Sequence, residues 1–467
     1  MTEQPPDRGA PPRGRAATAA HQREALSGLR AGAADRRRFL RELVERRGGD
    51  AAGQGVAGPG AARPGVAGAP ARGPGVALRE LPDREVLVVE QQLLARTGDL
   101  TAAARRLVDD AGWTGTEVAA LDRRVTSLRA GSGRAVDAER LRGDLADLDP
   151  PVRVSLAYLT PTRPVMKSTV TPDLPAPGEP LPSPPTAPEA GPGEPVRVVV
   201  VDTGLAVTAR TDGWLEGLQE PGNTDPLDVF PRPNGRLDLS AGHGTFVAGL
   251  VAQHAPGVPV TVVRAVDSDG LADEVEVAGK VVAAVQEHLA PGGRLVVNLS
   301  LGTETLDDEP PVALAVALEL VRELERSREA EVLLVAAAGN DGSTTRCWPA
   351  AFAATDGGVV AVAGLGSDGR PAAWSTHGEW VTCSAPGEAV LSTFVEGAED
   401  PAFDPQWQEF PADAWAYWTG TSFAAPQVAA RVAAAARASG GSLADALAGL
   451  LDGTPREPGF GALLGDA

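Results

Sequence analysis

The chain has 467 residues, a formal net charge of −20, 43% hydrophobic residues and only 4% aromatic residues. This length allows about three domains of about 150 residues each. The first 195 residues are nearly neutral, so the acidic excess lies in residues 196–467 and argues against nucleic acid or an anionic membrane surface as a main partner. The apolar runs are all shorter than the roughly 20 residues needed to cross a bilayer, so we expect no membrane span.

The two cysteines, Cys347 and Cys383, are too few for a disulfide framework, and we expect buried free thiols, with a bond between them as the alternative. The N-terminal residues lack the apolar segment of an ordinary signal peptide. Residues 36–41 (RRRFLR) resemble a twin-arginine export signal, but charged residues interrupt the segment that follows. We therefore expect a cytoplasmic protein, with export as the alternative.

Residues 1–84 predict a helical arm followed by a flexible segment. Leucines recur at three- and four-residue spacing over residues 17–47, which indicates an amphipathic helix. Gly48–Gly75 consists largely of Gly, Ala and Pro and lacks the apolar surface needed to fold. Residues 53–58 form a GxGxxG pattern, but no strand precedes it and Pro59 follows it, so we do not expect a dinucleotide site there.

Residues 85–168 predict a small α+β domain. We expect strands at Val86–Val89 and Val152–Leu159, one or two strands within Val118–Leu128, and helices at Ala102–Ala111 and Ala138–Leu148. The resulting order is β-α-β-β-α-β, which is typical of a ferredoxin-like unit.

A proline-rich linker over residues 169–195 leads to a larger α/β domain over residues 196–467. Its predicted strands are apolar on both faces, as parallel strands covered by helices must be. We expect strands at Val196–Val201, Val260–Val266, Leu295–Leu299, Val332–Ala338 and Val359–Val362, and helices at His243–His254, Ala272–Leu289, Pro311–Arg326, Ser422–Ala438 and Leu443–Leu451.

Three short motifs in this domain carry residues suited to nucleophilic catalysis. Asp202-Thr203-Gly204 ends a strand, Gly242-His243-Gly244-Thr245 opens a helix, and residues 420–426 (GTSFAAP) enter another helix at Ser422. Each residue alone could have a structural role: a loop cap, a core histidine or an N-cap. Together, a serine, a base to activate it and a carboxylate to orient the base are what acyl transfer requires.

The region from Val196 to about Gly453 resembles the catalytic domain of the subtilisin-like serine proteases, or subtilases. The order Asp, His, Ser is that of the family and differs from the order in other serine hydrolases. The resemblance implies a mostly parallel sheet flanked by helices, and serine endopeptidase activity with Asp202, His243 and Ser422 as the catalytic triad.

Further segments match the family's oxyanion and substrate-binding elements. Ala338-Gly339-Asn340 resembles the oxyanion segment, in which Asn340 would donate to the developing oxyanion, and loss of one such donor in subtilisin costs about 10²–10³ in rate. Ser300-Leu301-Gly302 and Gly270-Leu271 resemble the two edges between which a polypeptide substrate lies as an added strand.

The chain departs from the family pattern on the helix after the nucleophile, where Phe423, Gln427 and Ala430 replace the usual methionine, histidine and glycine. An insertion rich in Pro, Gly and Asp separates Asp202 from His243, and we expect it to reshape the rim of the cleft. The resemblance implies no required cofactor. Calcium sites are common in the family, and scattered carboxylates allow one here, although no EF-hand motif is present.

Two interpretations of the N-terminal part stay open. Many subtilases carry a β-α-β-β-α-β pro-domain that blocks the cleft, and residues 85–168 have a suitable size and element order, so one interpretation is intramolecular inhibition. The alternative is a permanent adaptor that binds a regulatory partner. A second alternative, for the whole chain, is a catalytically silent subtilase fold that only binds peptides.

Overall fold

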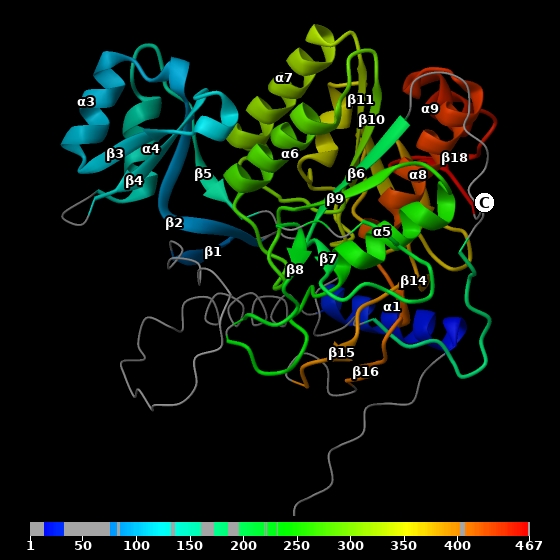
Figure 1. Ribbon diagram of the computed structural model, residues 1–467. Helices are drawn as coiled ribbons and strands as arrows, with labels where there is room; N and C mark the ends of the chain where they lie inside the picture. Colours follow the sequence, from blue (N-terminus) through cyan, green and yellow to red (C-terminus); the bar gives the residue numbers. More distant parts are fainter. Residues whose placement is uncertain are drawn as a thin grey trace, which may run out of the picture.

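The computed structural model describes residues 14–31, 75–81, 85–131, 136–159, 172–184, 196–218, 220, 222–230, 232–401 and 407–465. The twin-arginine-like segment, the GxGxxG pattern and the predicted helix beyond residue 31 lie outside these residues. Figure 1 shows a small domain, in cyan, beside a larger α/β domain. Within the described residues, no helix is both long and apolar enough to cross a bilayer.

The small domain is an antiparallel sheet with two helices. Its strand β2 is central, because it pairs with β1, β4 and β5, and β3 pairs with β4. Trp113, Leu93 and Leu141 are among the buried side chains of its core. The elements are β1 (Val76–Glu80), β2 (Glu85–Arg96), α3 (Ala102–Asp110), β3 (Trp113–Glu117), β4 (Val125–Ala130), α4 (Ala138–Ala146) and β5 (Val154–Tyr158).

The order from β2 to β5 is the expected β-α-β-β-α-β, but two details of the prediction are wrong. β1 adds a strand within the segment predicted to be flexible, because Val76, Ala77 and Leu78 pair with the first half of β2. β2 extends to Arg96, well beyond the predicted Val89. Of the one or two strands predicted within Val118–Leu128, one is present: β4 begins at Val125, after a 3₁₀ helix at Ala119–Leu121 that separates it from β3.

The large domain is built on an eight-stranded sheet with the strand order β18-β19-β13-β12-β11-β10-β6-β9. All neighbours are parallel except β18 and β19. The five predicted strands are present, and the predicted α/β class is confirmed. The strands are β6 (Val196–Asp202), β9 (Val260–Arg264), β10 (Arg294–Leu299), β11 (Glu331–Ala337), β12 (Val359–Leu365), β13 (Cys383–Pro386), β18 (Arg456–Glu457) and β19 (Gly461–Leu463).

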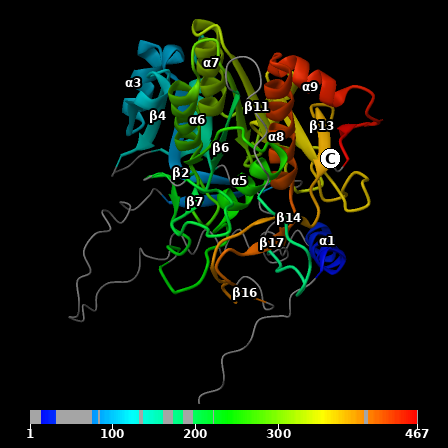
Figure 2. The ribbon, with the colours of Figure 1, turned by 45° about the vertical axis from the view of Figure 1, so that its right-hand side comes forward.

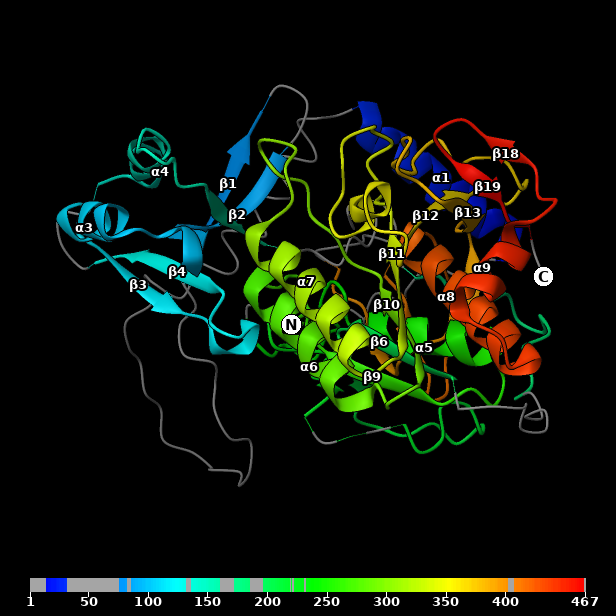
Figure 3. The same cartoon turned by 90° about the horizontal axis from the view of Figure 1, so that it is seen from above.

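Helices cover both faces of this sheet, as its uniformly buried strands require. α5 and α8 pack on one face with α9 beside α8, whereas α6 and α7 pack on the other (Figure 3). The helices are α5 (His243–His254), α6 (Glu274–His288), α7 (Val312–Ser327), α8 (Thr421–Ser439) and α9 (Leu443–Leu451).

Cys347 and Cys383 are buried free thiols, and burial raises the pKa of the Cys383 thiol to about 12.

Short strand pairs complete the large domain outside the main sheet. β7 (Leu205–Ala206) pairs with β8 (Thr224–Asp225) just after the end of β6. β14 (Val390–Thr393) pairs with β17 (Trp415–Trp418), and β15 (Gly397–Ala398) pairs with β16 (Glu409–Phe410). Because β17 leads directly into α8, this hairpin fixes the approach to Ser422.

The N-terminal helix α1 (Arg15–Ala31) lies against the large domain beside β14 and β17 (Figure 2). Ala19 packs on Ala389 and Tyr417. The Gln22 side chain donates to the Tyr417 carbonyl and accepts from the Thr419 hydroxyl. Arg23 makes a two-pronged ion pair with Glu388 at 2.7 and 2.8 Å. The start of the arm is therefore docked onto the strand that precedes the Ser422 motif.

Part of the predicted linker is also docked. Asp173 exchanges both backbone hydrogen bonds with Tyr417, which adds a bridge to the free edge of β17. The Tyr417 hydroxyl donates to Glu179, and the Trp214 indole donates to the Pro182 carbonyl. Residues 172–184 are thus part of the large domain's packing rather than only a spacer.

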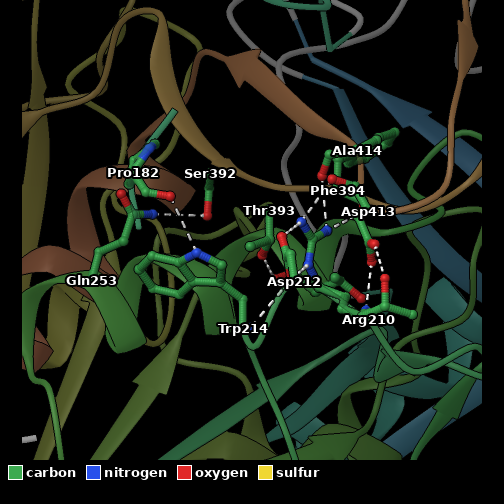
Figure 4. A network of polar contacts seen from close by, with 12 residues as sticks. Pro182, Arg210, Asp212, Trp214, Gln253, Ser392, Thr393, Phe394, Asp413 and Ala414 are labelled. Atoms are coloured by element: carbon green, nitrogen blue, oxygen red, sulfur yellow. Dashed lines mark hydrogen bonds and ion pairs between the residues drawn. The ribbon is translucent and has the colours of Figure 1, made fainter. Parts of the chain in front are cut away.

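A buried arginine ties the insertion after β7 to the segments that flank the β14–β17 hairpin (Figure 4). Arg210 is only 6% exposed and binds Asp212 through two nitrogens, at 2.6 and 3.1 Å. Its remaining N–H groups donate to the carbonyls of Phe394, Asp413 and Ala414. All five donors are used, which a lysine could not reproduce.

We predict that Arg210→Met lowers the free energy of unfolding by roughly 2–4 kcal/mol, because it leaves a partly buried carboxylate and three carbonyls without their donor. Chemical denaturation of the purified chain measures this change. Arg370→Ala, at an exposed position of the same domain, is the control and should change stability by less than about 0.5 kcal/mol. Equal effects of the two substitutions would contradict the role of the Arg210 network.

Candidate active site

The sheet brings three predicted motifs to one edge. Asp202 is the last residue of β6, and Ser300 and Asn340 follow the carboxyl ends of the neighbouring strands β10 and β11. His243 is the first residue of α5, and Ser422 is the second residue of α8. The carboxyl edge of a parallel sheet is where ligands bind in such folds.

Asp202 and His243 form a buried pair. Nδ1 of His243 lies 2.7 Å from Oδ1 of Asp202, and both side chains are fully buried. The same Asp202 oxygen accepts from the Thr203 backbone N–H at 2.7 Å. The bond between Asp202 and His243 holds the imidazole in one orientation, with Nδ1 toward the carboxylate and Nε2 on the opposite side.

Nε2 of His243 has no hydrogen-bond partner among the described residues. The imidazole packs beside two aromatic rings that also contact each other, with centroids 5.5 Å from that of Trp418 and 5.3 Å from that of Phe423. Because Phe423 directly follows Ser422, these contacts place the imidazole beside the first turn of α8. Because Nδ1 is engaged by Asp202, Nε2 is the ring nitrogen available for proton transfer.

Ser422 is held by a reciprocal contact with Ser300. The Ser422 hydroxyl donates to the Ser300 carbonyl at 3.2 Å, and the Ser300 hydroxyl donates to the Ser422 carbonyl at 2.7 Å. Asn298 in turn donates to the Ser300 hydroxyl at 2.9 Å. The Ser422 hydroxyl is therefore bonded to Ser300 and not to Nε2 of His243, which has no hydrogen-bond partner among the described residues.

Asn340 is fixed against the residue before Ser422. Its amide oxygen accepts from the Thr421 backbone N–H at 2.8 Å and from the Thr421 hydroxyl at 2.9 Å. The Gly339 N–H donates to the same hydroxyl at 3.1 Å, and Ala338 donates to Val362 on the next strand. With the oxygen engaged in this way, the donor Nδ2 is the end of the amide that can serve an oxyanion.

The two predicted substrate edges are buried in the full chain. Leu301 is 1% exposed, as is Leu271, and Gly270 adopts a φ of +85° in the turn that precedes Leu271. A Cβ at Gly302 would lie 2.5 Å from the sulfur of Cys347, so only glycine fits there. The side chains of Leu271 and Leu301 therefore belong to the hydrophobic core of the large domain.

The backbones of the aspartate and histidine motifs touch each other. A Cβ at Gly244 would lie 2.3 Å from the carbonyl oxygen of Gly204, and Gly204 itself has a φ of +102°. The Gly244 N–H donates to the Thr203 hydroxyl at 3.0 Å. This close approach explains why both motifs need glycine at these positions.

Sequence reasoning missed two buried aspartates between Asp202 and His243. Asp225 accepts from Thr203 and from the N–H of Gly242, and Asp238 accepts from Val229, Phe230 and Ser268 beside the predicted substrate edge. Burial raises the pKa of each carboxyl to about 6, although their hydrogen-bond donors oppose this shift. No local pattern distinguishes them from the exposed aspartates of the same insertion, so the sequence alone could not have identified them.

Within the part of the chain that the structure describes, no three His, Cys, Asp or Glu side chains are grouped closely enough to hold a metal ion.

The three departures from the family pattern lie on α8 and are buried: Phe423 packs on Phe246, and Gln427 donates to the Phe423 and Pro386 carbonyls. They contribute to packing behind Ser422.

A family model described as "Subtilase family" matches residues 193–449, which is more than half of the chain. The chain belongs to the subtilase family. Among its curated relatives, a thermophilic serine proteinase of Bacillus sp. (strain AK1) is 29% identical over 247 residues, covering 50% of each chain. A thermostable alkaline protease of Halalkalibacterium halodurans is 29% identical over 246 residues, covering 51% of this subtilase and 55% of the relative.

This subtilase thus spans about half the length of the curated relatives it matches. Among solved structures, fervidolysin from Fervidobacterium pennivorans, described as a keratinolytic enzyme related to subtilisin, aligns with a TM-score of 0.54 at 20% identity. The alignment covers 82% of this chain and 61% of that one, and it supports the fold.

Proposed function

We propose that this subtilase is a serine endopeptidase that cleaves polypeptides through an acyl-enzyme intermediate. The observation that carries the proposal is that the fully buried Asp202–His243 pair lies beside the first turn of α8, the helix that contains Ser422. Its curated relatives are named as proteases, which agrees with this assignment.

In the proposed reaction, Ser422 Oγ attacks the scissile carbonyl carbon and its proton passes to Nε2 of His243. Asp202 stabilises the imidazolium that forms, because its Oδ1 already lies 2.7 Å from Nδ1. His243 then gives the proton to the leaving amine. Water hydrolyses the acyl-enzyme by the same route, with His243 again acting as base and then as acid.

Two donors would stabilise the tetrahedral oxyanion. One is Nδ2 of Asn340, whose orientation Thr421 fixes through the amide oxygen. The other is the backbone N–H of Ser422, which has no partner within its own helix because it lies in the first turn of α8. The fold holds the Asn340 side chain through Thr421 and the Ser422 N–H in the first turn of α8, which supports a role that needs little reorganisation in the transition state.

The substrate is proposed to be an extended polypeptide lying between the segments at Gly270-Leu271 and Ser300-Leu301-Gly302. Both segments present backbone groups, so binding would depend on main-chain hydrogen bonds more than on particular side chains. The reaction steps above use only groups of this chain.

We predict that a fluorophosphonate probe labels the active protein at Ser422, and that Ser422→Ala abolishes labelling and lowers turnover of unfolded casein by at least about 10³-fold. Ser439→Ala, at an exposed position of the same helix, should leave both unchanged. Labelling that persists in Ser422→Ala would contradict the assigned nucleophile. Peptide binding without turnover in the wild type would instead favour a catalytically silent binding protein.

We further propose that the small domain inhibits the large one within the same chain. The sheet of the small domain packs on α6 and α7, with Leu87, Leu94 and Ala157 in the same buried cluster as the inner faces of these helices. Leu159, just after β5, bridges Asp273 beside the Gly270-Leu271 edge. The chain thus leaves the small domain at one border of the proposed substrate-binding cleft.

Charged groups also join the two domains. Arg96 and Arg124 each make two short hydrogen bonds to glutamates of α7, Glu319 and Glu323. These pairs are well exposed, so each contributes little to affinity in salt. Glu274 differs because it is fully buried, and it accepts from the N–H of Tyr158 on β5 and from the N–H of Ala313 on α7.

If the small domain is a pro-domain, the wild-type chain should lose roughly 170–195 residues from its N-terminus, whereas Ser422→Ala should remain whole. Intact-mass measurement of both proteins after expression tests this expectation. An uncut, active wild-type chain would contradict self-processing and favour the permanent adaptor.

The pH should control how tightly the small domain is docked. Burial raises the pKa of Glu274 well above its usual range, and the N–H groups of Tyr158 and Ala313 only partly oppose this shift. Because separation of the domains returns this carboxyl to water and lowers its pKa, docking is strongest where Glu274 is protonated and weakens as the pH rises through the raised value.

We therefore expect the radius of gyration of uncut Ser422→Ala, measured by small-angle scattering, to increase on going from acidic to alkaline pH. The double variant Ser422→Ala/Glu274→Gln, whose side chain does not titrate, should lose most of this dependence. An identical pH response in both proteins would exclude Glu274 as its origin.

A further inference from the structure

A second buried carboxylate, that of Asp225, lies next to the segments that carry the Asp202–His243 pair and has no part in the proposed reaction. Asp225 belongs to the insertion between these two residues, which was expected to reshape the rim of the cleft. Asp225 is instead fully buried on β8. A Cβ added at Gly204 would lie 2.9 Å from the backbone nitrogen of Asp225. This part of the insertion lies directly against the turn that follows Asp202.

The hydrogen bonds of Asp225 reach both catalytic motifs. Its Oδ2 accepts from the Thr203 hydroxyl at 2.8 Å and from the Gly242 N–H at 2.9 Å, while its Oδ1 accepts from the Leu227 N–H at 3.1 Å. Thr203 directly follows Asp202, and Gly242 directly precedes His243. A single carboxylate oxygen therefore joins the chain neighbours of the two paired residues.

The Thr203 hydroxyl extends this link to the other side of His243. It donates to Asp225 and accepts from the Gly244 N–H at 3.0 Å. The residues on both sides of His243 are thus held by Asp225 and Thr203, and Thr203 also donates its N–H to Asp202 Oδ1. These contacts hold the turn after Asp202 at a fixed distance from the start of α5. They therefore set the distance between Asp202 and His243.

A buried carboxylate is costly, and this cost is visible at Asp225. Burial raises the pKa of its carboxyl to about 6, against the opposing effects of its donors at Gly242, Thr203 and Leu227 and of the Arg264 charge. An apolar residue would avoid the cost but could not accept from a hydroxyl and two N–H groups. The three hydrogen bonds that the Asp225 carboxylate accepts therefore favour an aspartate at this position.

We propose that Asp225 is a positioning residue that, through Thr203 and Gly242, holds Asp202 and His243 in hydrogen-bonding register for proton transfer. The proposal rests on the endopeptidase function proposed above. Asp225 does not touch the reacting atoms, and its effect is on how often the Asp202–His243 pair has its productive geometry.

The sharpest test uses Thr203, because two substitutions there differ mainly in the hydroxyl. Thr203→Ser keeps the hydroxyl, and Thr203→Val keeps the shape but removes it. We expect Thr203→Val and Asp225→Ala each to lower kcat by about tenfold or more with KM changed less than about twofold, per site titrated with the fluorophosphonate probe. Thr203→Ser should restore kcat to within about threefold of the wild type.

The double variant Thr203→Val/Asp225→Ala should lose little more than either single variant, because both substitutions break the same link. Glu399→Ala, which removes another buried carboxylate of the large domain, is the control for general destabilisation. It should lower the unfolding midpoint without lowering kcat per titrated site. A normal kcat per titrated site in Thr203→Val would overturn the proposal, even if Asp225→Ala failed to fold.

A second readout does not depend on turnover. The proton of a buried imidazole Nδ1–H bonded to a carboxylate gives a far-downfield proton resonance, and we expect this signal in the wild type and Thr203→Ser but shifted or broadened in Thr203→Val. An unchanged signal in Thr203→Val would overturn the positioning role. Absence of wild-type turnover and labelling, with the signal responding as expected, would overturn the proposed function and leave the positioning role supported.

Discussion

The structure depends on one constraint, which is that an ionisable pair must be held at short range inside a fully buried part of the fold. Asp202 and His243 lie 2.7 Å apart and are fully buried, yet they come from a strand end and a helix start 41 residues apart in the chain. A carboxylate buried beside an imidazole is costly unless their geometry is good, so the segments that carry the two groups must be held in place. Much of the surrounding structure supplies this support.

The support comes from three directions. The parallel sheet brings Asp202, Ser300 and Asn340 to one edge, because the carboxyl ends of adjacent strands meet there. The close contact of Gly204 with Gly244 lets the two backbones approach, and Asp225 and Thr203 bind the segments together. The aromatic rings of Trp418 and Phe423 pack beside the imidazole.

The N-terminal part is joined to the same region from two sides. The small domain packs on α6 and α7 and reaches the Gly270-Leu271 edge through Leu159, while α1 and residues 172–184 contact Tyr417 on the strand before Ser422. Its contacts with the large domain are mixed: exposed arginine–glutamate pairs, a buried carboxyl at Glu274 and apolar packing. An interface that combines these elements can be stable in the intact chain and still respond to pH.

The sequence by itself determined the fold class, the main strands and helices, and the residues Asp202, His243, Ser422 and Asn340 as candidates. It could do so because strand and helix periodicity is local, and because each of these residues sits in a short motif with glycine where the backbone must approach another segment. Only the tertiary structure decided that Asp225 lies under the catalytic pair, that β1 joins the small domain and that residues 172–184 are docked. Each of these depends on contacts between residues far apart in the chain, and a buried aspartate in a polar loop has the same local sequence character as an exposed one.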